Sequence, residues 1–220
     1  MPYPMSHFYI AENILAGKGL AVNNAPQFYL GTLGPDAVHF RKDYSRAQKR
    51  VSHIYDNLDR GNLEVFAGNW IKNVENFYTG NKSNIDRDFL LGYCIHLMAD
   101  IYNYIYIWTP FKLAYGREND KLYQADGLST DLEIYQKENY ESKLFPILEK
   151  SEPFDFINLI SKNEMAELKN NILNVQYRDK QEVNTKTNKF MIYEKLMEWN
   201  NKALQFIIDE FSGLKEFTHD

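Results

Sequence analysis

The residues from Phe89 to Trp108, FLLGYCIHLMADIYNYIYIW, form a mostly apolar run without Lys or Arg. A helix of this length could cross a membrane. His96 and Asp100 stand in the middle of the run, however, and a mid-span aspartate costs about 3 kcal/mol on insertion. The flanks also lack the clusters of basic residues that anchor a span. We therefore expect a core helix that other helices surround on every face, rather than a membrane helix.

Helical spacing and helix-end signals occur along nearly the whole chain. The last helix is the clearest, because apolar residues from Tyr193 to Phe211 recur every three or four positions and Gly213 follows them. No run alternates with period two between hairpin turns, so strands are expected to be minor. The central helix is expected over about 86–108, ended by Pro110. Other helices are expected over 6–16, 26–34, 45–57, 63–78 with Gly80 after it, 129–135 after a loop around Gly127, 141–150, 154–161 and 164–176.

These elements predict one all-α domain over residues 1–220, a multi-helix bundle in which 176–189 is a polar surface loop. The single Cys94 excludes a scaffold held by internal disulfides. A net charge of −5 gives no general attraction for nucleic acid, so no stable nucleic-acid binding is expected. The first residues lack the basic and apolar segments of a signal peptide, which predicts a cytoplasmic protein. The oligomeric state stays open.

His96 and Asp100 are four residues apart, so both side chains point to one face of the helix. A buried carboxylate needs a strong partner. That partner can be His96 itself, an Arg from another helix, or a metal ion, and the pair alone does not decide among them. Gly92, one turn earlier, is expected to leave room for the backbone of a neighbouring helix.

Three further histidines precede this pair, His7, His39 and His53. Each taken alone is typical of a helix cap or a surface position. Together with Asp36, which follows a Gly-Pro turn, they supply nitrogen and oxygen ligands from several helices. Such a donor set suits zinc or a similar divalent ion.

The segments SHFYIAENI, GTLGPD, VSHIYD and FLLGYCIHLMAD, in this order over residues 6–100, resemble the zinc-dependent phospholipase C family and the related single-strand-specific zinc nucleases. Gly92, His96 and Asp100 match the pattern G-x-x-x-H-x-x-x-D of the central helix in that family. The resemblance implies an all-α bundle of the same type, active on phosphate esters.

Carried over by position, His53, His96 and Asp100 would ligate one zinc ion. His7 would belong to a second ion that Asp100 bridges. Asp36 would be a further ligand or the catalytic general base.

The chain also departs from the family pattern. The family's N-terminal Trp ligand is replaced by Met-Pro, and no histidine lies between Asp100 and His219. One or two ions are therefore expected in place of three. Asp126 and Asp131 could supply replacement carboxylates or could be a loop group and a helix cap.

The predicted activity is hydrolysis of a small-molecule or lipid phosphate ester by a zinc-held hydroxide. The alternative is a non-catalytic binding or structural protein that keeps a structural metal site. Cys94 is a poor nucleophile inside an apolar helix, and the only His-Asp dipeptide is His219-Asp220 at the end of the chain. Basic residues between two proposed ligands could meet a substrate phosphate or form a solvated helix face: Arg41, Lys42, Arg46, Lys49 and Arg50.

Overall fold

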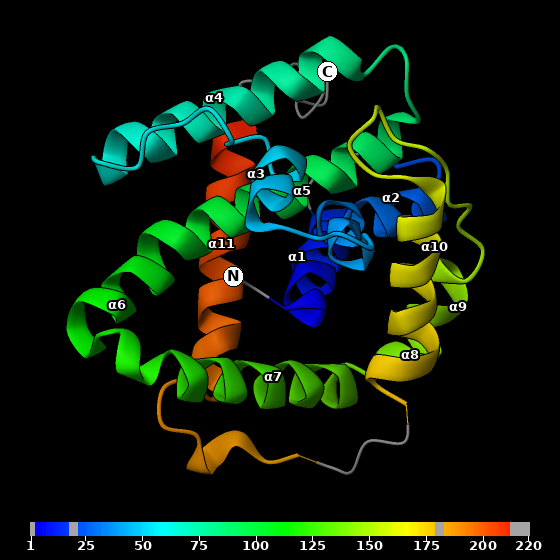
Figure 1. The fold of residues 1–220 in the computed structure, drawn as a ribbon. Coiled ribbons are helices and arrows are strands. Elements are labelled where there is room, and N and C mark those ends of the chain that lie inside the picture. The colour runs from blue at the N-terminus through cyan, green and yellow to red at the C-terminus, as the bar shows by residue number, and fades with distance from the viewer. Residues whose placement is uncertain (1–2, 18–21, 179–182, 212–220) are drawn as a thin grey trace.

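The computed structural model describes residues 3–17, 22–178 and 183–211, which form a set of packed helices (Figure 1). Within these ranges there is no β-strand, and an isolated bridge pairs Phe156 with Ile160. The prediction of an all-α fold is confirmed.

Helix α5 (Arg87–Asn103) runs through the middle of the molecule. Asp86 caps its first turn by accepting a hydrogen bond of 2.9 Å from the Phe89 N–H. Every residue from Asp88 to Asn103 is buried, as expected for a helix enclosed on all faces. Among the described residues, no helix is long and apolar enough to cross a membrane.

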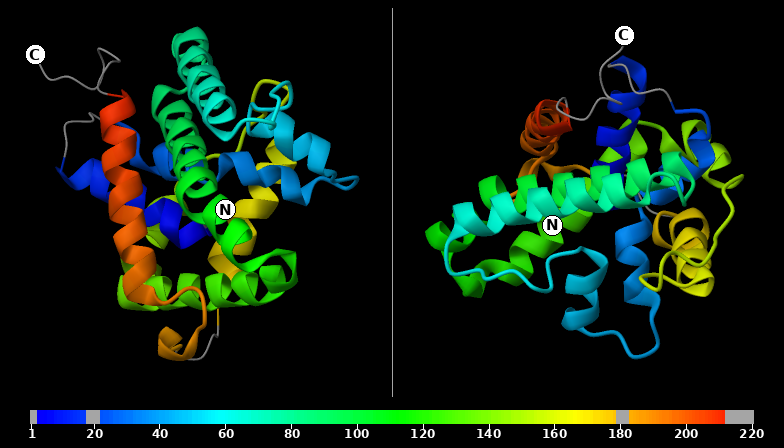
Figure 2. Two further views of the ribbon diagram at one scale, coloured as in Figure 1. Left: turned by 90° about the vertical axis from the view of Figure 1, so that its left-hand side faces the viewer. Right: turned by 90° about the horizontal axis from the view of Figure 1, so that it is seen from above.

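Four helices pack against α5, and Figure 2 shows α4 running alongside it. They come from both ends of the chain and enclose α5 between them: α1 (Pro4–Gly17), α2 (Ala25–Gly31), α4 (Leu63–Asn81) and α11 (Tyr193–Phe211).

The long helix α7 (Asp120–Lys137) and a series of short helices complete the fold. Those that precede α4 are η1 (Gly34–Phe40) and α3 (Arg46–Ser52). Those that follow α5 are η2 (Tyr104–Trp108), α6 (Thr109–Tyr115), η3 (Arg117–Asn119), α7 (Asp120–Lys137), α8 (Tyr140–Lys143), α9 (Phe145–Leu148), α10 (Lys162–Asn171), η4 (Ile172–Gln176) and η5 (Thr185–Thr187).

The contact between α2 and α5 depends on two glycines. A Cβ on Gly92 would lie 2.1 Å from the Phe28 carbonyl oxygen, and a Cβ on Gly31 would lie 2.1 Å from the Phe89 carbonyl oxygen. No real side chain tolerates such distances to backbone atoms. The expectation that Gly92 admits a neighbouring backbone is confirmed, and Gly31 is its counterpart on α2.

Two expected helix boundaries, at Pro110 and around Gly127, are wrong. Pro110 stands in the first turn of α6, directly after the π-helical turn η2, and the chain stays helical through η2 into α6. Gly127 lies inside the continuous helix α7. A Cβ at this position would stand 2.3 Å from the Tyr3 ring, so the close packing requires a glycine. It marks a close packing contact rather than a loop.

Other boundaries also shift. The segment 154–161 is not helical, since Ile157 and Asn158 take positive φ values in a tight turn. Helix α3 ends at Ser52, before Ile54 with a φ of 52°, and α4 continues through Gly80.

The expected surface loop at 176–189 contains the short helix η5 with the buried Thr185. Residues 179–182 of this segment, and Gly213, lie outside the described ranges.

We predict that Gly92→Ala destabilises the fold by at least about 2 kcal/mol, because the methyl group forces α2 away from α5. Gly68→Ala is the matched control, since Gly68 is also helical and a Cβ there meets nothing within 4 Å. The control is expected to be neutral or stabilising by up to about 1 kcal/mol. Urea unfolding followed by circular dichroism measures both variants. Equal stability of the two would contradict the close contact.

Candidate metal centre

Five side chains from four segments meet beside the middle of α5. His7 comes from α1, Asp36 from η1, and His53 is the residue that caps the C-terminal end of α3. His96 and Asp100 come from α5 itself. The four other than Asp36 are at most 2% exposed, whereas the Asp36 side chain is 23% exposed. The structure therefore brings together all five residues that the sequence singled out as ligands.

The ring nitrogens and carboxylate oxygens of these residues point at one another. His53 Nε2 lies 3.3 Å from Asp100 Oδ2 and 3.5 Å from Asp36 Oδ1. His96 Nε2 lies 3.9 Å and 4.0 Å from the Oδ2 atoms of Asp100 and Asp36, and His7 Nε2 lies 3.7 Å from Asp100 Oδ1. Ligand atoms around a tetrahedral zinc ion, with bonds of about 2.0–2.1 Å, are about 3.3–3.4 Å apart. A small contraction of the cluster would match that spacing.

Most of these atoms have no hydrogen-bond partner. Nε2 of His7, His53 and His96 is unpaired, as are both oxygens of Asp100 and Nδ1 of His7. Leaving buried polar groups unsatisfied costs about 1–3 kcal/mol each, and more for a charged group. A hydrogen-bonded His96–Asp100 pair does not form, and among the described residues no Arg forms an ion pair with Asp100. Of the three partners that the sequence left open for Asp100, the metal ion is the one that stays a prediction.

The Nδ1 atoms of His96 and His53 face away from the cluster and lie next to polar groups that orient the two rings. His96 Nδ1 lies 2.8 Å from the Thr32 carbonyl oxygen. A carbonyl can only accept, so in the neutral ring Nδ1 carries the proton and Nε2 presents a lone pair to the cluster. His53 Nδ1 lies 2.9 Å from Ser52 Oγ, whose single proton reaches the Pro35 carbonyl oxygen at 3.0 Å. Ser52 can then accept from His53, which leaves Nε2 of that ring toward the cluster as well.

The surroundings of the cluster shift the pKa values of its side chains toward the protonation states that bind metal ions. Burial lowers the pKa of His7 well below its usual value, reinforced by nearby His96. Burial also lowers the pKa of His96, so both imidazoles are neutral at pH 7. Burial alone would raise the pKa of Asp100, but the close approach of His53 and of the other imidazoles lowers this pKa overall. The favoured forms, neutral imidazole and ionised carboxylate, are those that bind metals.

Lys49 places a fixed cation at the edge of the cluster. Its Nζ donates a hydrogen bond of 2.7 Å to Asp36 Oδ1 and lies 3.4 Å from His39 Nε2. Burial acts to lower the pKa of Lys49, but Asp36 and Asp100 raise it overall, so the ammonium stays charged. The same ammonium holds the pKa of Asp36 well below its usual value against the opposing effect of burial. One ammonium does not neutralise two carboxylates, which leaves the cluster attractive to a further cation.

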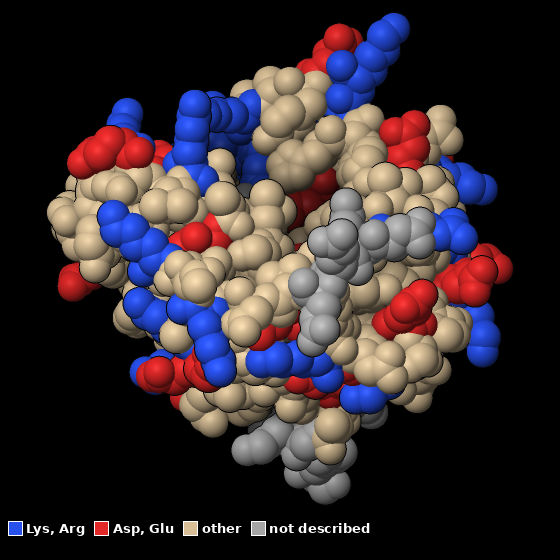
Figure 3. Space-filling model, turned by 90° about the horizontal axis from the view of Figure 1, so that it is seen from below, with Lys and Arg blue, Asp and Glu red and all other residues tan. Residues whose placement is uncertain are grey.

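A cavity of about 620 Å³ opens onto this cluster through Asp36 and Lys49. Its size is that of a small-molecule site, and most of its wall is aromatic or aliphatic. The space-filling view from below shows a hollow with acidic atoms at its depth and basic side chains nearby (Figure 3). The residues that line the cavity are Tyr3, Pro4, Asp36, His39, Phe40, Lys49, Tyr55, Arg60, Tyr104, Trp108, Tyr123, Gln124, Leu128, Leu168, Asn171 and Gln176.

Two overlapping sets of donor atoms are close enough to hold an ion each. One set is His7, His96 and Asp100, and the other is Asp36, His53 and His96. The resemblance instead groups His53, His96 and Asp100, with Asp100 as the bridge. In the structure His96 is the residue common to both sets. The assignment of each residue to an ion stays a prediction.

Asp126 and Asp131 do not join the cluster, because both carboxylates bind backbone groups elsewhere. Asp131 Oδ1 accepts from the Met5 N–H at 2.9 Å, which holds the first turn of α1, and Asp126 Oδ2 accepts from the Phe190 N–H at 2.7 Å. Both lie within α7 rather than in a loop or at its cap. Cys94 is fully buried and burial raises the pKa of its thiol, so the thiol is a poor nucleophile, as expected.

The basic residues between Asp36 and His53 divide into two groups. Lys49 reaches the cavity, as described above, whereas Arg41 forms an ion pair with Glu164 at 2.6 Å. The side chains of Lys42, Arg46 and Arg50 are exposed and do not line the cavity.

Sequence reasoning missed three groups at this site. The Thr32 carbonyl is a backbone group, so no residue type in the sequence indicates its role. Ser52 was visible only as part of a Ser-His motif, and Arg60 lies in a polar loop without a distinguishing signal.

No family model, no curated protein and no solved structure matches the chain.

We predict that the chain binds zinc and that Asp100→Asn lowers its affinity for zinc by at least about 100-fold, because even the loss of an outer partner of a ligand costs 10–100-fold. Asp126→Asn is the matched control, a buried carboxylate that serves only backbone groups. Equilibrium dialysis followed by elemental analysis measures both. Equal zinc retention in the two variants would place the ion elsewhere.

Proposed function

We propose that the chain is a metal-dependent hydrolase of phosphate esters, with zinc as the metal. The observation that supports this most is the set of unpaired, buried nitrogen and oxygen atoms that converge where a cavity of small-molecule size begins. The ordered motifs that resemble those of the zinc-dependent phospholipases C favour the same chemistry.

The proposed holders of one or two ions are His7, Asp36, His53, His96 and Asp100. A bound zinc ion supplies a Lewis acid for a phosphoryl oxygen and lowers the pKa of water to about 7, so that a nucleophile is available at neutral pH. In the reaction, a water oxygen forms a new bond to phosphorus, the ester P–O bond breaks, and the departing alcohol takes up a proton.

Asp36 is placed to act on the attacking water. It is the one carboxylate that both belongs to the cluster and lines the cavity among the described residues. Its pKa is held well below the usual range, so it is ionised and accepts a hydrogen bond readily, but it is a weak proton acceptor. We therefore assign two main roles to Asp36, which are to ligate the ion and to orient the water. Its role as a general base is the lesser one.

Lys49 is placed to meet the developing charge. Its ammonium lies at the wall of the cavity, bonded to Asp36, where it can approach an oxygen of the phosphoryl group. A fixed cation that faces a growing negative charge in a partly dry site is worth more than one in water.

The competing proposal is a structural metal site in a protein without catalytic activity. The near-complete burial of His7, His53, His96 and Asp100 favours it, because structural sites are closed. The partial exposure of Asp36 toward the cavity favours the enzyme, since a catalytic site keeps one side open.

We predict that the zinc-loaded protein hydrolyses bis-p-nitrophenyl phosphate and that His96→Ala reduces kcat/KM at least about 100-fold. His219→Ala is a control for the loss of one histidine, and full activity is expected. Release of p-nitrophenolate gives the rate. A protein that retains zinc but turns over neither this ester nor a phosphomonoester supports the structural proposal, and a protein that binds no divalent metal contradicts both.

We predict that Lys49→Met lowers kcat/KM for the same ester by at least about 10-fold, because the ammonium no longer faces the phosphoryl oxygens. Zinc binding is expected to persist, since the substitution removes a cation that competes for Asp36. Lys42→Met, at an exposed position, is the control. Loss of zinc together with activity would show that Lys49 only supports the fold.

A further inference from the structure

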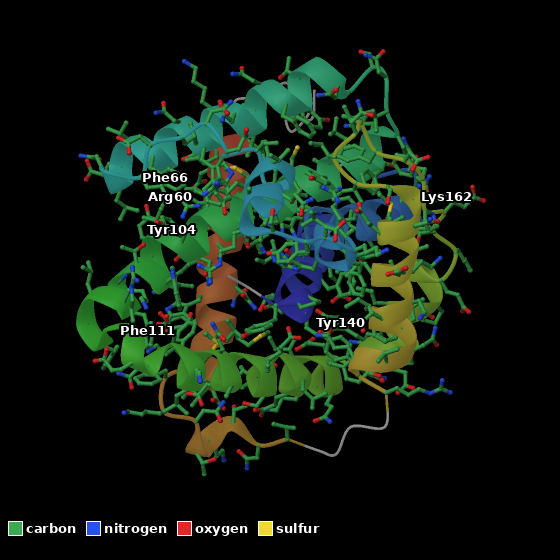
Figure 4. The ribbon with its side chains drawn as sticks, in the orientation of Figure 1. Arg60, Phe66, Tyr104, Phe111, Tyr140 and Lys162 are labelled. Carbon is green, nitrogen blue, oxygen red and sulfur yellow. The ribbon has the colours of Figure 1, made fainter. Side chains whose placement is uncertain are left out.

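Arg60 occupies an unusual place on the cavity wall. It lies in the loop between α3 and α4, and its guanidinium stacks over two rings, with Cζ 4.9 Å from the Tyr55 centroid and 5.6 Å from the Phe66 centroid. Figure 4 shows Arg60, Phe66 and Tyr104 close together between α4 and the end of α5. Stacking of this kind restrains the guanidinium without using up its five N–H donors.

Among the described residues, no carboxylate lies within ion-pair distance of this guanidinium. The ion pairs of the described residues within 4.0 Å do not include Arg60, although they include Arg41 and Lys49. Lys49 is paired with Asp36, the single acidic residue among those that line the cavity in the described part of the chain. The cavity wall therefore carries one positive charge without a partner, at Arg60.

The aromatic part of the cavity wall is suited to an organic group. Tyr104, Trp108 and Tyr123 line it, and the Phe66 ring lies 5.3 Å from the Tyr104 ring. The faces of Tyr55 and Phe66, which would attract a cationic group of a ligand, are already occupied by the guanidinium. The cavity thus disfavours a quaternary ammonium group at this position and favours an anion.

We propose that Arg60 is a specificity-determining residue that binds a second anionic group of the substrate. The substrate class is then a phosphate ester whose organic part carries a further phosphate or carboxylate, held by Arg60 while the ester phosphate lies at Lys49 and the metal cluster. This inference rests on the proposed function. Bidentate pairing of a guanidinium with a phosphate or carboxylate gives both geometry and strength.

Two chromogenic esters test the proposal. Thymidine 5′-(p-nitrophenyl phosphate) and the same compound with a 3′-phosphate share the scissile bond and the leaving group, and they differ only in the second anionic group. With the zinc-loaded wild-type chain, kcat/KM is expected to be at least about 10-fold higher for the 3′-phosphorylated ester. Raising the salt concentration is expected to reduce this preference.

Arg60→Gln is expected to bring the ratio of the two kcat/KM values close to one, and Arg60→Lys to restore part of it. Arg50→Gln is the matched control, because it removes one exposed positive charge that does not line the cavity, and its ratio is expected to equal that of the wild type. A wild-type ratio near one, or a ratio that Arg60→Gln leaves unchanged, would overturn the proposal.

Calorimetric titration gives a readout apart from turnover. Thymidine 3′,5′-bisphosphate is expected to bind at least about 10-fold more tightly than thymidine 5′-monophosphate, and this difference is expected to vanish in Arg60→Gln. If neither ester is hydrolysed but the binding difference depends on Arg60, the anion site stands and the hydrolase proposal fails. If both esters are hydrolysed equally well, the hydrolase proposal stands and the role of Arg60 fails.

Discussion

The backbone contact between α2 and α5 is the constraint on which the site depends. Gly31 and Gly92 let each helix approach a carbonyl oxygen of the other so closely that no side chain fits between them. That approach carries the Thr32 carbonyl to His96 Nδ1, and so turns Nε2 toward the cluster. It also sets the start of η1, which carries Asp36. A helix pair held apart by one methyl group would misplace both ligands.

The second constraint is electrostatic. Asp100 is buried with both oxygens unpaired, while the neighbouring histidines present ring nitrogens that lack partners. Such an arrangement costs free energy in any fold unless a cation neutralises it. Lys49 partly meets this need at Asp36, on the side that faces the cavity. The proposal of a site for an anionic ester rests on this change from a closed cluster to an open cavity wall that carries Lys49.

The fold class and the membership of the cluster were predictable from the sequence. The apolar run around His96 required enclosure by other helices, and His7, His53 and Asp36 lie beside His96 and Asp100 in the folded chain. The helix ends around Pro110 and Gly127 were not predictable from local signals, because tertiary contacts used those residues differently.

The roles of the Thr32 carbonyl, which orients His96, and of the stacked Arg60 could not be predicted from the sequence either. A backbone atom and a loop cation acquire a role only through the folded arrangement.

Anomalous diffraction at the zinc absorption edge, from crystals of the zinc-loaded protein, tests the central claim most directly. The account predicts a peak within about 2.0–2.1 Å of His96 Nε2 and within bonding distance of Asp100 or Asp36. A second peak at the other set of donors would define a two-ion centre. Crystals that bind zinc only at surface side chains, with no peak among these atoms, would contradict the account.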